Sequence, residues 1–362
     1  MQNGTPIWAA WSANAISIYR QQQRGTVEQI SLPRKMKADL RYFLKLYHLN
    51  DGSLLLRSGN SHGTCLDVGR GAERFQPIAG WPELLSACSP YQVIPFNDGT
   101  IAGIRSNLPQ LILWQPGASF RVCKLPEGFM IHDVDRDHQK RLWICGALPA
   151  RKLKSLEYRR ALAMSENDGV SWHVHDVVHG GFKLAWQSLL SGAEAAYRTI
   201  NVVDDHVVLS AETDNYADTS TFLFVRNAQG RWQSGVLKSD ILRAMLPARP
   251  GELEIISHYG QAVSITPRNK WRYQSLLPRI HSLMQGMDKR PPKDARYEIL
   301  DAQAAPSGKR ILVISVRVSE EKQLVRFGEA VVTLSEKGDH LITFHNQDNA
   351  EILTASYWSR SE

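Results

Sequence analysis

Cysteine is scarce in this 362-residue chain, and the few cysteines lack the spacing that metal binding or redox chemistry requires. The four cysteines include no Cys-x-x-Cys pair, and disulfide-stapled domains carry a denser set. Cys123 and Cys145 stand in strand-like segments, which favours small buried side chains. We therefore expect reduced thiols, a cytoplasmic protein and no structural metal.

Long apolar runs and nucleotide-binding motifs are also missing. No stretch approaches the roughly 18 apolar residues of a membrane span, and the N-terminal segment lacks the basic start and apolar centre of a signal peptide. There is no glycine-rich phosphate loop and no Gly-x-Ser-x-Gly elbow. We therefore predict no membrane contact and no cofactor.

Short runs of alternating apolar and polar residues dominate the sequence, while helical periodicity is rare. Two kinds of hairpin alternate along the chain, with Asn-Asp-Gly and Ser-Gly-Lys supplying turns. The first kind occupies 43–59, 91–107, 130–147, 197–213 and 297–316. The second kind occupies 16–33, 111–126, 162–178, 222–237 and 330–344.

Paired hairpins that recur in this way are typical of β-propeller blades. The sequence predicts an all-β fold with one domain over 1–362, most simply a seven-bladed propeller, with six or eight blades as alternatives. The leftover strand 351–358 is expected to complete the first blade and close the ring. The predicted blades are 7–32 with 351–358, 42–79, 91–126, 130–178, 197–240, 253–277 and 297–345.

The turn of the second hairpin in the fourth blade resembles the Asp-box, or BNR repeat, of sialidase-like β-propellers. Ser165, Asn167, Gly169, Ser171 and Trp172 occupy the places of that motif, with Asn167 replacing the usual aspartate. The resemblance implies a device that stabilises the blade, on the face away from a catalytic site. The residue types agree with this structural role, because polar turn-forming residues precede a large apolar residue that enters a strand.

The long segments are predicted to lie on the opposite face of the propeller. In a blade with alternating strand directions, turns within hairpins share one face, and connections between hairpins and between blades share the other. The long connections are 34–41, 147–160, 179–196, 212–221, 238–252 and 278–296. Loops on a rigid scaffold often carry binding. The candidate binding residues are Arg151, Lys152, Lys154, Arg159, Arg160, Trp186, Tyr216, Lys289, Arg290, Lys293 and Arg296.

The balance of charge favours an acidic partner. The formal net charge is +7 at pH 7, which bears on steering and solubility rather than on fold. The basic loops lack interleaved aromatic residues, and the acidic segment 212–218 is expected on the same face, so a nucleic-acid track is disfavoured. Solvated charge that only aids solubility is the alternative interpretation.

The sequence contains no complete catalytic motif, but it offers candidate residues. Asp133, Asp135, Glu212 and Asp214 are the candidate acids for a glycosidase built on paired carboxylates. The Arg-Ile-Pro-like motif that the sialidase resemblance would imply is missing. The run at 173–179 places His173 and His175 on one side of a strand, but their spacing does not match a metal site.

Two hypotheses follow. The leading one is a non-catalytic propeller that binds a protein through its loop-rich face, as a scaffold, an assembly factor or a toxin-immunity protein. The alternative is a divergent sialidase-like glycoside hydrolase or lyase, with its site in the central depression of the same face. The sequence does not determine the oligomeric state.

Overall fold

The computed structural model describes most of the strands and several of their connections. The described residues are 5–12, 15–22, 25–30, 44–49, 53–60, 63–69, 75–80, 82–86, 88, 92–105, 108–149, 158–175, 199–203, 206–212, 221–227, 229–238, 240–248, 252–266, 270–288, 290–304, 309–320, 323–346 and 351–358.

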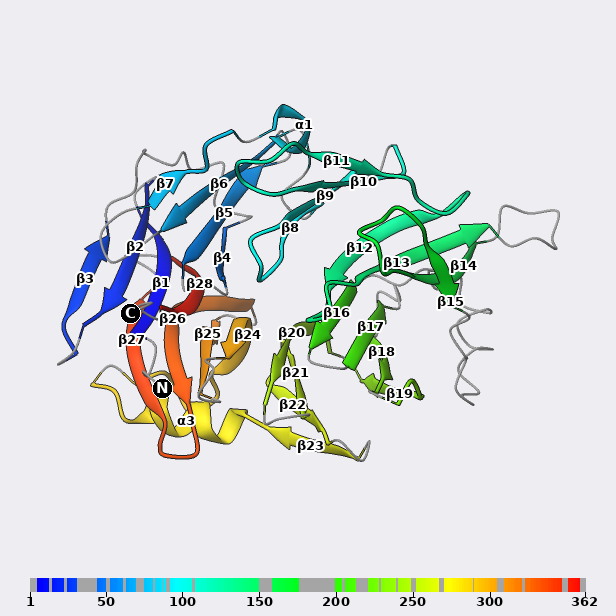
Figure 1. Cartoon of the computed structure of the whole chain (residues 1–362). Coiled ribbons are helices and arrows are strands. Elements are labelled where there is room, and N and C mark those ends of the chain that lie inside the picture. Colours follow the sequence, from blue (N-terminus) through cyan, green and yellow to red (C-terminus); the bar gives the residue numbers. More distant parts are fainter. Residues whose placement is uncertain are drawn as a thin grey trace.

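The described strands form seven four-stranded antiparallel sheets around a common centre (Figure 1). Named from the inner to the outer strand, the first three blades are β28 (Glu351–Trp358), β1 (Thr5–Ser12), β2 (Ala15–Gln21), β3 (Val27–Ile30); β4 (Lys45–His48), β5 (Leu54–Asn60), β6 (Gly63–Gly69), β7 (Phe75–Pro77); and β8 (Val93–Pro95), β9 (Ile101–Arg105), β10 (Gln110–Trp114), β11 (Arg121–Cys123). The other four are β12 (Met130–Arg136), β13 (Leu142–Pro149), β14 (Tyr158–Ser165), β15 (His173–His175); β16 (Thr199–Val203), β17 (His206–Glu212), β18 (Thr221–Arg226), β19 (Trp232–Leu237); β20 (Leu242–Pro247), β21 (Leu253–Ser257), β22 (Gln261–Ile265), β23 (Trp271–Ser275); and β24 (Arg296–Ala304), β25 (Arg310–Glu320), β26 (Gln323–Leu334), β27 (His340–Asn346). The prediction of an all-β propeller with seven blades is confirmed.

The C-terminal strand is the inner strand of the first blade. It pairs antiparallel with β1 and lies between the inner strands β24 and β4. Gln303 of β24 donates through Nε2 to the carbonyl of Leu46 in β4 at 2.7 Å, and Thr354 of β28 donates to Asp301 Oδ2 at 2.5 Å. Blades seven, one and two are thus tied together at the centre.

The middle strands of the blades are buried on both sides. Six consecutive residues of β13, from Leu142 to Ala147, are buried, because each blade packs against a neighbour on either face. Such strands appear in a sequence as continuous apolar runs. The core consists of clusters between blades, such as Trp143 and Leu162 of blade four against Val207 and Leu209 of blade five.

The sixth blade differs from its expected limits. Its inner strand β20 lies within 238–252, which was expected to be a connection. A register shift between Leu242 and Ala244 places an extra residue in the strand, so the burial pattern does not alternate and the strand was missed.

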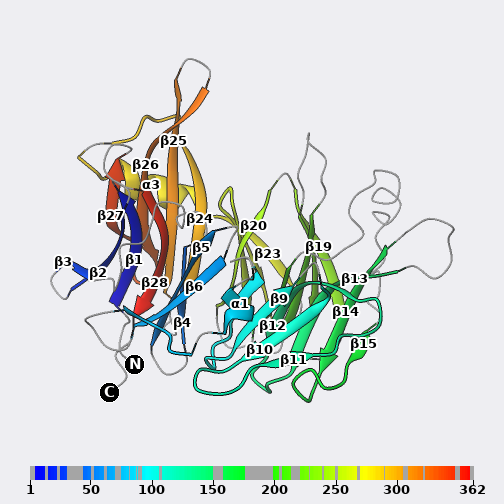
Figure 2. The ribbon, with the colours of Figure 1, turned by 90° about the horizontal axis from the view of Figure 1, so that it is seen from above.

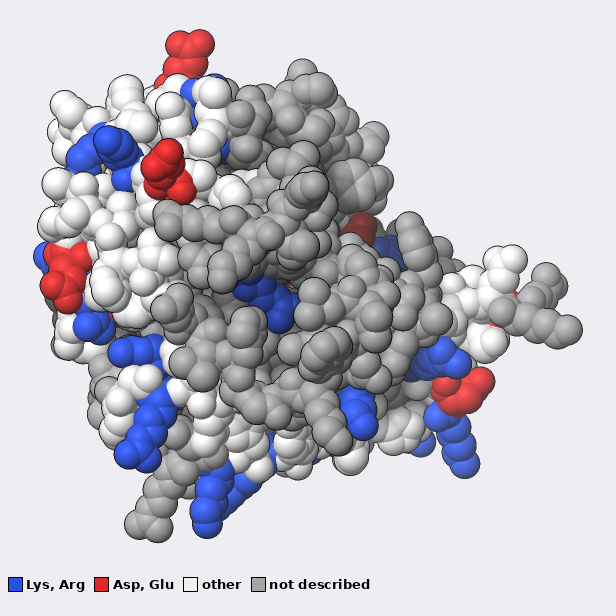
Figure 3. Space-filling view, turned by 90° about the vertical axis from the view of Figure 1, so that its right-hand side faces the viewer, with Lys and Arg blue, Asp and Glu red and all other residues white. Residues whose placement is uncertain are grey.

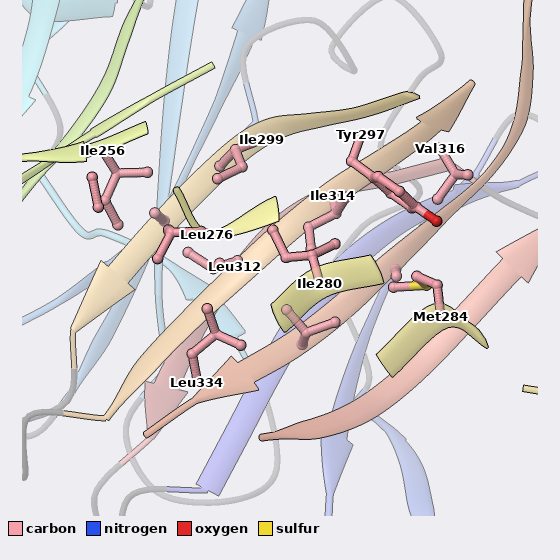
Figure 4. Close-up of a cluster of buried hydrophobic side chains, with 14 of the residues drawn as sticks. Ile256, Leu276, Ile280, Met284, Tyr297, Ile299, Leu312, Ile314, Val316 and Leu334 are labelled. Carbon is pink, nitrogen blue, oxygen red and sulfur yellow. The ribbon is translucent and has the colours of Figure 1, made fainter. Parts of the chain in front are cut away.

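The segment 278–296 is also not a simple projecting loop, because it contains helix α3 (Leu277–Gln285). The helix buries Ile280 and Met284, which are four residues apart on one helical face. They belong to one buried cluster with Ile256 of blade six and Ile314 of blade seven (Figure 4). The second helix of the described chain is the short α1 (Glu83–Ser86).

The two faces of the propeller differ (Figure 2). In each blade, the turn between the first and second strands and the turn between the third and fourth strands lie on the same face. The turn Ser165–Trp172 between β14 and β15 is one of them. We call this face the turn face, and the opposite one the loop face. Residues 248–252 join β20 to β21 and therefore lie on the turn face, contrary to expectation. Within the described residues, no helix is long and apolar enough to cross a membrane.

Candidate functional site

The motif at Ser165–Trp172 forms a tightly hydrogen-bonded turn. Ser165 Oγ accepts from the backbone N–H of Gly169 at 2.8 Å. Asn167 Oδ1 accepts from the N–H of Ser171 at 2.9 Å, and its Nδ2 donates to Ser171 Oγ at 2.8 Å. The asparagine therefore both accepts from and donates to Ser171, whereas an aspartate would act as an acceptor only.

The same turn is fastened to blade three. Trp172 Nε1 donates to the carbonyl of Lys124 at 2.9 Å. Gly169 has φ of +81°, and a Cβ built there would lie 2.5 Å from Cys123 Sγ, so only glycine fits against β11. These contacts stabilise the interface between blades three and four.

Asp133 and Asp135 lie between the inner strands of blades four and five. Asp133 accepts from the N–H of Val134 and of Ile200, both at 2.9 Å. Asp135 accepts from the N–H of Arg136 at 2.7 Å and of Val202 at 2.6 Å. Burial raises the pKa of both carboxyls to about 7. Each carboxylate thus links β12 to β16 through backbone N–H groups.

Most other candidate residues lie outside the described part of the chain. Those outside it are Arg151, Lys152, Lys154, Trp186, Asp214, Tyr216 and Lys289; of Glu212 and Arg159 only the backbone is described. Arg160 lies over the ring of Phe224 at 5.7 Å, between blades four and five. Arg290, Lys293 and Arg296 are exposed on the connection between blades six and seven.

A cluster that the sequence did not reveal lies at the loop-face end of blades six and seven. It contains Arg243 of β20, His258 of the β21–β22 turn, Glu298 of β24 and Arg317 of β25. Arg243 Nε is 3.2 Å from His258 Nδ1, and His258 Nε2 is 3.6 Å from Glu298 Oε2. Arg317 Nε is 2.8 Å from the same Glu298 oxygen. We call these four residues the rim cluster.

Backbone hydrogen bonds hold the rim cluster in place. The N–H of His258 donates to the carbonyl of Ile241 at 2.8 Å, and its carbonyl accepts from the N–H of Ile299 at 2.7 Å. The N–H of Tyr259 donates to Asp240 Oδ1 at 3.0 Å. The imidazole is therefore fixed between the two blades, on a rigid support rather than on a free loop.

The charged groups of the rim cluster differ in exposure. Arg317 pairs with Glu298, Arg243 contacts His258, and the buried carboxylate of Asp240 lies beside them. The side chains of Glu298 and His258 are only 13% and 11% exposed, whereas that of Arg317 is 40% exposed. Tyr259, next to the imidazole, is 49% exposed. Nowhere in the described residues do three or more His, Cys, Asp or Glu side chains gather as metal ligands.

The rim cluster has no motif that a sequence could show. Its members come from three strands and a turn, spread from Arg243 to Arg317. All three of those strands carry register shifts that alter which way a side chain points. The one local signal is the polar turn at 258–260, with Gly260 at φ of +76°.

Comparison with known proteins identifies the fold only. No protein-family profile and no curated protein matches the sequence. A crystal structure of a protein from Lactobacillus plantarum is similar, with a TM-score of 0.53 and 10% identity over 99% of this chain and 100% of that chain. A streptogramin B lyase has a TM-score of 0.49 and 10% identity over 89% and 95% of the two chains. A functionally unknown protein from Desulfotomaculum acetoxidans has 0.49 and 11% over 97% and 99%. At such identity a likeness shows shared architecture alone, here that of the β-propellers.

Proposed function

We propose that this β-propeller is a non-catalytic protein that binds an acidic protein partner through its loop face. The observation that carries the proposal is the rim cluster, in which Arg243 is exposed and the side chain of Arg317 is 40% exposed at a preformed position on that face, while the carboxylates of Glu298 and Asp240 are mostly buried. Preformed positive charge favours encounter with acidic surfaces and sets the orientation of the partner.

A projecting hairpin on the same face supports the proposal. β25 and β26 have 11 and 12 residues, more than the other described strands. Their far ends, where Val318 pairs with Val325 and Glu320 with Gln323, stand above the rest of the blade as a two-stranded ribbon (Figure 2). A two-stranded ribbon is marginally stable by itself. The presence of this ribbon beside the rim cluster therefore favours a role in contacting the partner.

Exposed cations extend from the rim cluster along the neighbouring connection. Arg290, Lys293 and Arg296 are exposed there, beside the acidic Asp288 and Asp294. Basic side chains are also visible over one side of the molecule, with fewer acidic ones among them (Figure 3). The surface is therefore mixed but carries an excess of positive charge.

The same proposal includes a superfamily, a cellular location and a type of binding protein. The bonding of Ser165 and Asn167 supports an Asp-box and a place in the sialidase-like superfamily. Cys88, Cys123 and Cys145 are buried and form no disulfide, which supports a cytoplasmic location. A scaffold, an assembly factor and a toxin-immunity protein all agree with the loop face. The alternative, a sialidase-like hydrolase or lyase, loses support because Asp133 and Asp135 bond the backbone between blades.

Charge reversal on the two faces tests the proposal. The double change Lys293→Glu and Arg296→Glu acts on the loop face, while Lys337→Glu acts on an exposed turn-face position of the same blade. Each variant is expressed in the native host, captured by a tag, and its co-purifying proteins are quantified by mass spectrometry. We expect one partner, rich in acidic residues, to be lost from the loop-face variant and kept by the turn-face variant.

Two results would contradict the proposal. Equal capture of the same partner by both variants would show that the loop face is not used. Turnover of chromogenic glycosides that disappears in an Asp133→Asn variant of unchanged stability would favour the catalytic alternative.

A further inference from the structure

Arg57 of β5 is buried between blades two and three with few partners of its own. The residue is 8% exposed, and its Nη1 donates to the carbonyl of Val93 in β8 at 2.7 Å. Its Nε is buried and lacks a hydrogen-bond partner in the described chain, where no carboxylate forms an ion pair with the guanidinium. A buried cation without a contacting counter-ion is costly, so we expect an anion beside it.

A second cation accompanies Arg57 near the centre of the ring. Arg57 pairs in register with Lys45, the first residue of the inner strand β4 (Figure 1). Paired residues of antiparallel strands have Cβ atoms about 4.5–5.5 Å apart, and like charges there are unfavourable. Arg57 Cζ lies 5.2 Å and Lys45 Nζ lies 5.8 Å from the centre of the Tyr47 ring. One aromatic side chain thus contacts both positive groups.

Two carboxyl groups near these cations limit the charge that a ligand can carry. Asp301 Oδ1 is 3.8 Å from Lys45 Nζ. Burial raises the pKa of Asp133 to about 7, and the charge of Arg57 acts against this rise. The oxygens of Asp133 accept from two backbone N–H groups, and neither carboxyl bonds to Arg57. Both would repel a multiply charged anion, so the position suits at most one negative charge.

The remaining donors of Arg57 select the shape of the anion. Because Nη1 bonds to Val93, the donors left are Nε and Nη2, which form one edge of the planar guanidinium. Two parallel N–H···O bonds from such an edge fit a carboxylate. A side chain this deeply buried is reached more readily by a small molecule than by the surface of a protein.

We propose that Arg57 binds the carboxylate of a small organic acid near the centre of the ring, with Lys45 adding positive charge and Tyr47 supporting the guanidinium. The site goes beyond the proposed function, because it requires no protein partner. It is also separate from the rim cluster, which lies between blades six and seven.

The test follows the Nε–Hε signal of Arg57 in nitrogen-15 NMR spectra of the intact, deuterated protein, assigned by its loss in Arg57→Met. Sodium acetate is the probe, and sodium chloride at equal ionic strength is the control. Inorganic phosphate and the acetylated, amidated peptide Gly-Glu-Gly are compared with acetate. Urea midpoints are measured with and without acetate for the wild type, Arg57→Met and Lys45→Met. Arg272→Met, at an exposed arginine of β23, is the matched control.

We expect acetate to shift the Arg57 signal saturably and to raise the urea midpoint of the wild type, because a ligand that binds only the folded state stabilises it. Arg57→Met should weaken acetate binding by about tenfold or more, since a charge-assisted pair of hydrogen bonds is lost. Lys45→Met should weaken it by about two- to fivefold, and Arg272→Met should leave it unchanged. Without acetate, Arg57→Met should be at least as stable as the wild type, because methionine replaces an unpaired buried charge.

Four results would overturn the site: no saturable shift with acetate, an equal shift with chloride, an undiminished acetate response in Arg57→Met, or tighter binding of phosphate than of acetate. A large loss of stability in Arg57→Met without acetate would show that the arginine is structural. Tighter binding of the peptide than of acetate would overturn the assignment to a small molecule. If Arg57→Met does not fold, the wild-type titration and the weaker response of Lys45→Met still decide the matter.

Discussion

Replacing Asp133 by asparagine tests whether the buried acids of β12 are structural. The carboxylate accepts two backbone N–H groups, one from Val134 in its own strand and one from Ile200 in blade five. An asparagine side chain accepts through one atom only and presents an NH2 donor to the second N–H. One buried N–H group then lacks an acceptor, which costs about 1–3 kcal/mol of unfolding free energy.

The pH dependence of this cost follows from the pKa of Asp133. Burial raises it to about 7 in the folded state, well above the value of about 3.9 for an unfolded chain. The folded protein therefore binds a proton that the unfolded chain has released, and the stabilisation is complete below about pH 4 and is lost as pH rises through 7. In that window the wild-type unfolding free energy falls by about 1.4 kcal/mol per pH unit for this group.

Asparagine does not titrate, so the deficit of Asp133→Asn should be larger at pH 5 than at pH 8. Urea unfolding, followed by the fluorescence of the ten tryptophans, measures the unfolding free energy at both values. Asp294→Asn, at an exposed position, is the matched control and should differ from wild type by no more than about 0.5 kcal/mol. Equal stability of wild type and Asp133→Asn, or a deficit that grows with pH, would refute the reasoning.

Two further changes test the packing of the blades. Gly169→Ala should lower the unfolding free energy by about 2–5 kcal/mol, because strain from the left-handed backbone adds to the overlap with Cys123. Gly117→Ala is the control, since Gly117 has φ of +85° and no atom within 4 Å, so it should show the backbone strain alone. Equal urea midpoints for the two variants would contradict the overlap. Truncation after residue 350 removes β28 and exposes the edges of its neighbours. We expect aggregation in size-exclusion chromatography and fast proteolysis, whereas an unchanged elution profile would show that β28 is dispensable.

Local chemistry explains why much of the fold was predictable. Asp168 and Gly169 have φ of +55° and +81°, as expected of an Asn-Asp-Gly turn, because turn conformation depends on adjacent residues. The same reasoning found the recurring hairpins and the C-terminal strand. It failed at β20, where a register shift breaks the alternation, and at α3, whose short apolar face with Ile280 and Met284 becomes evident only when two blades cover it.

The sequence by itself therefore determined most of the hairpins, since each depends on residues close together in the chain, and it left the strand 351–358 over to complete the first blade. Only the tertiary structure decided which charged groups meet. Asp133 is a candidate acid in the sequence, and only the structure shows that the N–H of Ile200 in blade five donates to it. Arg243 and Arg317 lie far apart in sequence and become parts of one cluster because blades six and seven pack side by side. Contacts of this kind depend on the closeness of blades, which no local pattern encodes.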